Sequence, residues 1–141
     1  MFFGDFYPRM DDKGRLALPA KFRDTLGAGM VITKAQEGCL SVFPRSQFER
    51  IAERLDGAGM TNPAVRNYTR QLFGAADDQT PDKQGRIVIK AALREFAGLQ
   101  HDCVVLGVNT HVEIWDAQVH RSHSADVAQT FVGPNSDLPP I

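Results

Sequence analysis

Two arginines occupy equivalent places in a phrase that the chain contains twice. Residues 11–18 read DDKGRLAL and residues 82–89 read DKQGRIVI, so Arg15 and Arg86 lie 71 residues apart (86 − 15) in a chain of 141. The planar guanidinium of arginine can donate two parallel hydrogen bonds to O6 and N7 of guanine, which lysine matches less well. The duplication therefore predicts that whatever the unit does is presented twice, with approximate two-fold symmetry. If these arginines contact double-stranded DNA, a G-rich sequence would suit them.

Further basic residues accompany each arginine. DNA carries one negative charge per about 1.7 Å of helix axis, so a DNA-binding surface needs several cations. Residues 1–35 carry six basic and four acidic side chains and residues 81–98 carry four and two, whereas the whole chain has a net charge of −1. The other candidate DNA contacts are Arg9, Lys13, Lys21 and Arg23 in the first copy and Lys83 and Arg94 in the second. The alternative for each of them is an ordinary solvated surface charge.

An aspartate precedes each arginine by four residues, and a glycine precedes it directly. Asp11 and Asp82 can each pair with the arginine or close the turn through the backbone, which would give the arginines a structural role. Because a carboxylate repels a phosphate, we interpret both aspartates as orienting or structural groups rather than as DNA contacts. Gly14 and Gly85 occupy the place in each turn where glycine can adopt a positive φ.

The two copies predict the same order of elements. The patterns favour a turn, a returning strand, a short helix and two further strands, with a leading strand before the first turn. In the first copy the elements are residues 6–10, 11–14, 15–18, 20–26, 30–33 and 39–43. In the second copy they are residues 82–85, 86–89, 91–97, 103–108 and 112–115. Two helices connect the copies; Ser46 and Glu49 predict a capping box for the first, and the second begins at Asn62-Pro63.

The repeat also divides the chain into parts. We expect a first unit with its following helix over residues 1–55, a helical connector over 56–76, a second unit over 77–120 and a disordered tail over 121–141. The chain is 43% hydrophobic and no apolar run approaches the roughly 20 residues of a membrane span. We therefore expect a cytoplasmic protein without a membrane partner, in which Cys39 and Cys103 are buried free thiols.

The turn with its arginine, returning strand and short helix resembles the AbrB/SpoVT family of bacterial DNA-binding domains. The resemblance rests on the two D-x-x-x-R turns and on GRLALP at 14–19, GRIVI at 85–89, LREFAGL at 93–99 and LFGAA at 72–76. The resemblance covers residues 1–115. It is strongest to family members that carry two such units in one chain. It implies a β-rich α+β fold, in which two swapped-hairpin units form an intramolecular pseudo-dimeric β-barrel with connecting helices. It also implies that Arg15 and Arg86 contact DNA.

The same resemblance implies a function. Such two-unit proteins are transcriptional regulators of the division and cell-wall gene cluster that includes their own gene. The resemblance implies a ring-shaped homo-oligomer, often an octamer, that binds short direct repeats upstream of the promoter and is associated with the nucleoid. We also expect no cofactor, no metal and no small-molecule substrate. One departure is Lys90, which stands where Pro19 begins the first short helix, so the two copies need not contact DNA equally.

Other classes of function compete with this interpretation. A protein-interaction scaffold or an antitoxin-like partner-binding module could also use the fold, although AbrB-type antitoxins usually have one copy and a partner-binding tail. An enzyme is not indicated, because the sequence offers no nucleophile with its base, no phosphate-binding glycine loop and no cluster of metal ligands. His120 and His123 have a spacing that could share a metal on a helix, but no further ligand lies nearby in the sequence.

Overall fold

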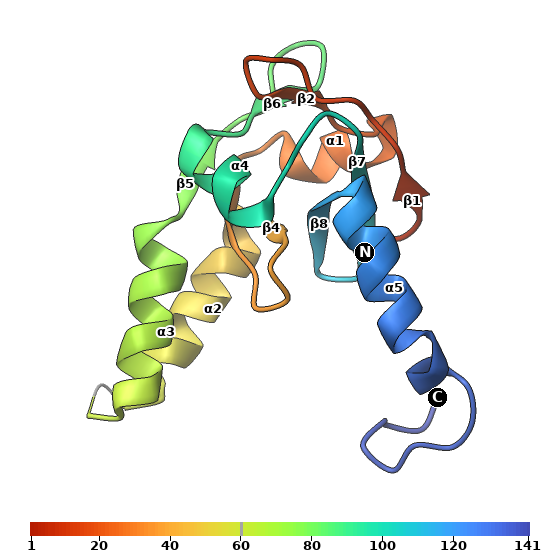
Figure 1. The fold of residues 1–141 in the computed structure, drawn as a ribbon. Helices are drawn as coiled ribbons and strands as arrows, with labels where there is room; N and C mark the ends of the chain where they lie inside the picture. The colour runs from red at the N-terminus through yellow and green to blue at the C-terminus, as the bar shows by residue number, and fades with distance from the viewer. Residues whose placement is uncertain (60) are drawn as a thin grey trace.

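The computed structural model describes residues 1–59 and 61–141 and shows a mixed α+β protein (Figure 1). Its strands are β1 (Asp5–Phe6), β2 (Arg15–Ala17), β3 (Met30–Lys34), β4 (Leu40–Pro44), β5 (Asp77–Gln79), β6 (Arg86–Val88), β7 (Cys103–Val108) and β8 (His111–Asp116). Its helices are α1 (Ala20–Leu26), α2 (Arg45–Gly57), α3 (Pro63–Gly74), α4 (Ala91–Ala97) and α5 (Ala117–Phe131). Figure 1 shows the β2–β6 ribbon at the top of the molecule, with α2 and α3 extending away on one side and α5 on the other.

Six strands form one antiparallel sheet in the order β1-β7-β8-β4-β3-β5, and β2 pairs with β6 in a separate two-stranded ribbon. The copies exchange their leading strands, because β1 of the first copy pairs with β7 of the second and β5 of the second pairs with β3 of the first. At the centre of the sheet β4 pairs with β8. Neither copy therefore completes its own part of the sheet.

The register shows the approximate two-fold symmetry that the repeat predicts. In the ribbon, Leu16 lies directly opposite Ile87, which is its own counterpart in the second copy. In the sheet, Ser41 lies opposite Glu113, which follows it by 72 residues (113 − 41) and is again its counterpart. A local two-fold axis therefore passes through both pairs, and it relates the two halves of one chain as it would relate the subunits of a dimer.

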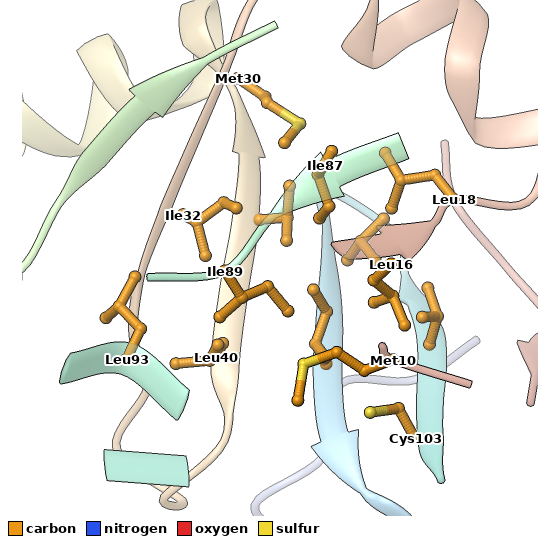
Figure 2. Packing of buried hydrophobic residues seen from close by; sticks show 14 of the residues in the cluster. Met10, Leu16, Leu18, Met30, Ile32, Leu40, Ile87, Ile89, Leu93 and Cys103 are labelled. Carbon is orange, nitrogen blue, oxygen red and sulfur yellow. The ribbon is translucent and has the colours of Figure 1, made fainter. Parts of the chain in front are cut away.

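The ribbon closes one hydrophobic core that both copies share (Figure 2). Leu16 and Leu18 from one side and Ile87 and Ile89 from the other are each at most 1% exposed. Full burial of each such side chain contributes about 1.5–3 kcal/mol. The remaining members of the core that Figure 2 labels are Met10, Met30, Ile32, Leu40, Leu93 and Cys103.

Most of the predicted elements are confirmed. Both short helices have the predicted bounds, and the four strands that follow them agree within one residue at each end. The leading strand is shorter than predicted: β1 ends at Phe6, and Arg9 makes only an isolated bridge to Asp102, because Pro8 between them has no N–H to donate. Cys39 and Cys103 are buried free thiols, as predicted.

Three expectations need correction. The sheet is open, with β1 and β5 at its edges, so the described strands do not form a closed barrel. The predicted disordered tail is helical over its whole first half, residues 121–131, because α5 continues to Phe131. The helix is capped at its start by Asp116, whose carboxylate accepts from the N–H groups of Gln118 and Val119. The capping box is absent: α2 begins at Arg45, before Ser46, and no side chain caps its N-terminus.

Truncation of the shared core provides a test of the ribbon's orientation. Ile87→Ala should lower the free energy of unfolding by about 2–5 kcal/mol, because it removes buried methyl groups at the two-fold axis. Val88→Ala is the matched control, since its side chain lies on the outer face, and should change stability by less than about 0.5 kcal/mol. Urea unfolding at one fixed protein concentration measures both variants, and equal losses would contradict the assigned faces of β6.

Candidate nucleic-acid interface

Each hairpin turn is held by one aspartate that also holds the arginine. The carboxylate of Asp11 accepts from the backbone N–H groups of Lys13 and Arg15 at 2.9 and 2.8 Å, and from the Nε of Arg15 at 2.6 Å. Asp82 repeats this arrangement, with the N–H of Arg86 at 2.9 Å and its Nε at 3.1 Å. The two roles that the sequence left as alternatives, closing the turn and pairing with the arginine, are therefore performed by the same carboxylate.

The hydrogen bonds also affect the charge of each turn. The backbone N–H of Arg15 contributes most to lowering the pKa of Asp11, and the N–H of Arg86 does the same for the pKa of Asp82. Both carboxylates therefore stay ionised at neutral pH and fix the direction of the guanidinium. The side chains of Arg15 and Arg86 are each 42% exposed, and within the described residues their Nη groups make no hydrogen bond.

The outer face of the ribbon brings the two arginines together. Leu16 and Ile87 point inward, so the alternation along each strand directs residues 15, 17, 86 and 88 outward. Arg15 lies opposite Val88 and Arg86 lies opposite Ala17. The arginines are thus diagonal neighbours, a relation that places Cα atoms about 7–8 Å apart in an antiparallel pair. Figure 1 shows the two turns rising beside this face at the top of the molecule.

Each turn is supported from below by an arginine of the other copy. The φ of Gly14 is +79°, and a Cβ there would lie 2.5 Å from the carbonyl oxygen of Ile89 and 3.1 Å from the Nε of Arg94. Gly85 has a φ of +76° and leaves no room for a Cβ beside the guanidinium of Arg23. These glycines are required by close packing as well as by φ. That second requirement depends on contacts between the copies, which the sequence does not reveal.

Arg23 and Arg94 therefore lie beneath the turns rather than on the outer face. The Nε of Arg23 donates to the carbonyl oxygen of Leu18 at 3.0 Å. The Nε of Arg94 is buried and has no hydrogen-bond partner among the described residues. Both side chains are half-buried, in contrast to the exposed Arg15 and Arg86. The geometry suits a supporting role for Arg23 and Arg94.

The remaining predicted basic residues are dispersed. Lys13 and Lys83 are exposed at the tips of the two turns. The Nζ of Lys21 lies 3.9 Å from the centre of the Phe3 ring, a cation–π contact away from the ribbon. Arg9 lies 4.0 Å from Asp102 in an exposed ion pair. Of the predicted set, the structure thus gathers Arg15, Arg86, Lys13 and Lys83 about the ribbon and its turns. Sequence reasoning overlooked Val88, whose exposure follows from the alternation along β6.

The histidines and cysteines do not form a reactive or metal-binding centre in the part of the chain that the structure describes. No group of three or more potential metal ligands occurs there. His120 and His123 pack on the ring of Trp115 at centroid distances of 5.4 and 4.8 Å. Burial raises the pKa of both thiols, to about 11 for Cys103, which disfavours the nucleophilic thiolate.

None of the described helices has both the length and the apolar character that crossing a membrane requires.

The fold and this surface define a class of protein in which two copies of one turn–strand–helix unit share a core and present a paired-arginine ribbon. A family model with the description "MraZ protein, putative antitoxin-like" matches residues 1–71 and again residues 72–132. The chain belongs to the MraZ family. The two matches correspond to the two copies in the sequence.

Curated relatives agree over nearly the full chain. The chain is 53% identical over 140 residues to a "Transcriptional regulator MraZ" from Frankia alni, covering 99% of this chain and 98% of the relative. It is 53% identical over 131 residues to the protein of that name from Thermobifida fusca, covering 93% and 92%. For the protein of that name from Mycobacterium ulcerans the identity is 52% over 123 residues, covering 87% and 86%. The family is one of transcriptional regulators and not of enzymes.

The carboxylates of the turns should make stability depend on acid pH. The pKa values of Asp11 and Asp82 are lower in the folded chain than in the unfolded one. Their contribution to stability is therefore complete above the ordinary aspartate pKa of about 3.9, and is lost as the pH falls through their lowered folded-state values. The double variant Asp11→Asn/Asp82→Asn should accordingly lose less stability than the wild type on acidification.

The urea midpoint measured from about pH 6 down to about pH 2.5 gives this comparison. Asp24→Asn, at an exposed position of α1, is the control and should keep the wild-type profile. Parallel profiles for the wild type and the double variant would show that the two turn carboxylates do not carry the acid sensitivity.

Proposed function

We propose that this chain is a sequence-specific DNA-binding transcriptional regulator that recognises short G-rich direct repeats through the outer face of the β2–β6 ribbon. The observation that carries the proposal is the pair of exposed arginines, each fixed through Nε by its own aspartate and each with Nη groups available for a guanine edge. A guanidinium that is already oriented loses less side-chain entropy when it binds.

A two-stranded ribbon suits the major groove of DNA. The groove is about 12 Å wide and admits either an α-helix or a β-ribbon. Arg15 and Arg86 donate to guanine O6 and N7, while Lys13 and Lys83 at the turn tips contact phosphates on either side. In this proposal Arg23 and Arg94 support the turns, and Arg9 and Lys21 make at most outlying phosphate contacts. The DNA-presenting units are residues 1–55 and 77–120, joined by the connector 56–76.

The proposed assembly is a ring-shaped homo-oligomer, such as an octamer. The whole chain has a net charge of −1, so one ribbon offers few cations, and several ribbons on one ring would bind repeated boxes through avidity. Support for self-association comes from the helices that extend from the sheet. Tyr68 and Phe73 of α3 and Val119 and Val127 of α5 are apolar side chains that remain 37–41% exposed in the single chain.

The proposed target is the division and cell-wall gene cluster that includes the regulator's own gene, bound upstream of the promoter. The regulator then works in the cytoplasm, at the nucleoid. The names of the curated relatives, each a transcriptional regulator, support the regulatory part of this proposal.

A second candidate is a protein-interaction scaffold or an antitoxin-like partner-binding module. The groove between α2 and α3 favours it, because this groove has a cavity volume of about 500 Å³ and combines apolar and polar lining residues that could bind a partner segment. They are Ala52, Leu55 and Phe73 with Glu53, Asp56 and Thr69. The antitoxin-like description of the matching family model points the same way. Copurification of one stoichiometric partner, together with no salt-sensitive DNA binding, would favour this candidate.

Loss of the paired arginines should abolish specific DNA binding without unfolding the protein. Each bidentate arginine–guanine contact is worth about 1–3 kcal/mol, so Arg15→Ala should weaken binding roughly 5- to 150-fold and the double variant with Arg86→Ala further. Binding to a G-rich direct-repeat duplex and to a scrambled duplex, measured over a series of salt concentrations, tests this.

Arg121→Ala removes the same charge from the exposed surface of α5 and is the matched control, with His120→Ala as a second. Both should bind almost as the wild type does, and circular dichroism should show every variant folded. If the double arginine variant kept the wild-type preference for the direct repeats, the proposed site would be wrong.

The proposed ring predicts a mass in solution well above that of a dimer. Light scattering coupled to size exclusion should give a multiple of the 15.6 kDa chain near eight. Replacing the exposed aromatic side chains in Tyr68→Ser/Phe73→Ser should shift the mass downward, whereas Phe3→Ser, another exposed aromatic on a different surface, should not. A monomeric wild type would contradict the ring and the avidity argument together.

A further inference from the structure

The outer face of the ribbon breaks the two-fold symmetry that its inner face keeps. Arg15 and Arg86 are counterparts, as are Leu16 and Ile87, but the third counterpart pair consists of Ala17 and Val88. Val88 is a β-branched side chain that is 50% exposed between charged neighbours. Arg15, at one end of the ribbon, therefore faces an isopropyl group, and Arg86, at the other end, faces only a methyl group.

Val88 is held in place more firmly than an ordinary exposed residue. The side-chain amide of Gln79 donates through Nε2 to the carbonyl oxygen of Val88 at 2.8 Å and accepts its N–H through Oε1 at 3.0 Å. This pair of bonds resembles one rung of a further strand on the free edge of β6. The counterpart of Gln79 in the first copy is Pro8, which offers no side-chain amide to Ala17. The clamp therefore acts at the Val88 end alone.

A rigid apolar side chain beside an arginine that binds guanine can contact one apolar group in the major groove of DNA. Thymine is the base that presents a methyl group there, at C5, and apolar side chains recognise it by contact. A ribbon that places Arg15 against a guanine edge places its directly opposite neighbour, with Cβ atoms about 4.5–5.5 Å apart, against an adjacent base pair.

We propose that Val88 is a specificity-determining residue that contacts the C5-methyl group of a thymine next to the guanine bound by Arg15. Ala17 is too short to make the equivalent contact beside Arg86. The inference rests on the proposed DNA-binding function and adds to it the base that accompanies one of the two guanines. Gln79 is a positioning residue, because it acts on DNA only through the backbone of Val88.

The asymmetry gives the ribbon a direction on DNA. A DNA-binding surface with strict two-fold symmetry matches palindromic half-sites and binds one recognition sequence equally well in either orientation. One thymine contact at one end favours a single orientation, so successive protomers would all read boxes that point the same way. That arrangement is a direct repeat.

The test removes the methyl group from the DNA and the isopropyl group from the protein. The wild-type chain selects its preferred duplex from a randomised pool, and that duplex is then made with each thymine in turn replaced by deoxyuridine, which lacks only the methyl group. At one thymine within two base pairs of a guanine, the replacement should weaken wild-type binding about fourfold, the worth of one buried methyl group. Val88→Ala should bind the thymine duplex about fourfold more weakly than the wild type and should not distinguish thymine from deoxyuridine there.

Two further variants separate the contact from a general effect on the fold. Gln79→Ala keeps the side chain of Val88 but removes the two hydrogen bonds that hold its backbone, so it should reduce the preference for thymine over deoxyuridine. Adding Arg15→Ala to Gln79→Ala should weaken DNA binding by the same factor as adding it to the wild type. Ala17→Val should introduce a second thymine preference beside the other guanine. Circular dichroism and unfolding controls apply to each variant.

The outcomes separate this inference from the function on which it rests. If Val88→Ala keeps the wild-type ratio of thymine to deoxyuridine affinity, or if the selected duplex has no thymine within two base pairs of its guanines, the thymine contact is wrong. In that case, loss of binding in Arg15→Ala/Arg86→Ala would still support the proposed function. If the wild type shows no salt-sensitive preference for any duplex, both proposals are overturned.

Discussion

The pairing of β2 with β6 is the interaction on which the rest of the structure depends. It is made between the two copies, with Leu16 opposite Ile87, and is extended by two reciprocal hydrogen bonds, from the N–H of Leu18 to Gly85 at 2.9 Å and from the N–H of Ile89 to Gly14 at 2.8 Å. A unit of about 70 residues buries so little of its surface that its stability alone is marginal. Cross-pairing solves this, because each ribbon strand turns its apolar residues into one core that both copies line.

The same pairing decides how the charged groups are used. Exposed ion pairs contribute little by themselves, so the attraction between Asp11 and Arg15 is not what holds the turn. The turn is held by the hydrogen bonds that the carboxylate of Asp11 accepts from the backbone N–H groups of Lys13 and Arg15. The contact with Nε then fixes the side chain of Arg15 at little extra entropic cost. Beneath the turn, Arg94 fills the space that the glycine leaves. The exposed arginine thus rests on a fully constrained base.

Symmetry is kept where packing enforces it and lost where solvent permits. The core counterparts Leu16 and Ile87 differ little in volume, because a close-packed interior does not tolerate larger changes. On the outer face no such limit applies, so Ala17 can correspond to Val88 and Lys13 to Gln84. Duplication within one chain makes such divergence possible, since a homodimer would have to change both sites together. These differences between the two ends of the outer face can therefore orient the molecule on a DNA sequence that is not palindromic.

The sequence by itself determined the duplication, the turns, the short helices and the apolar strands, because turn chemistry and apolar periodicity act over a few residues. It also determined that Arg15 and Arg86 are equivalent. Only the tertiary structure decided that β1 pairs with β7, that the sheet is open, and that Arg23 and Arg94 lie beneath the opposite turns. The order in α5, whose apolar pattern is weak, likewise needed the cap at Asp116 and the packing of its histidines on Trp115. Each of these depends on partners distant in the chain, and a local pattern specifies which face a residue takes but not which segment will cover it.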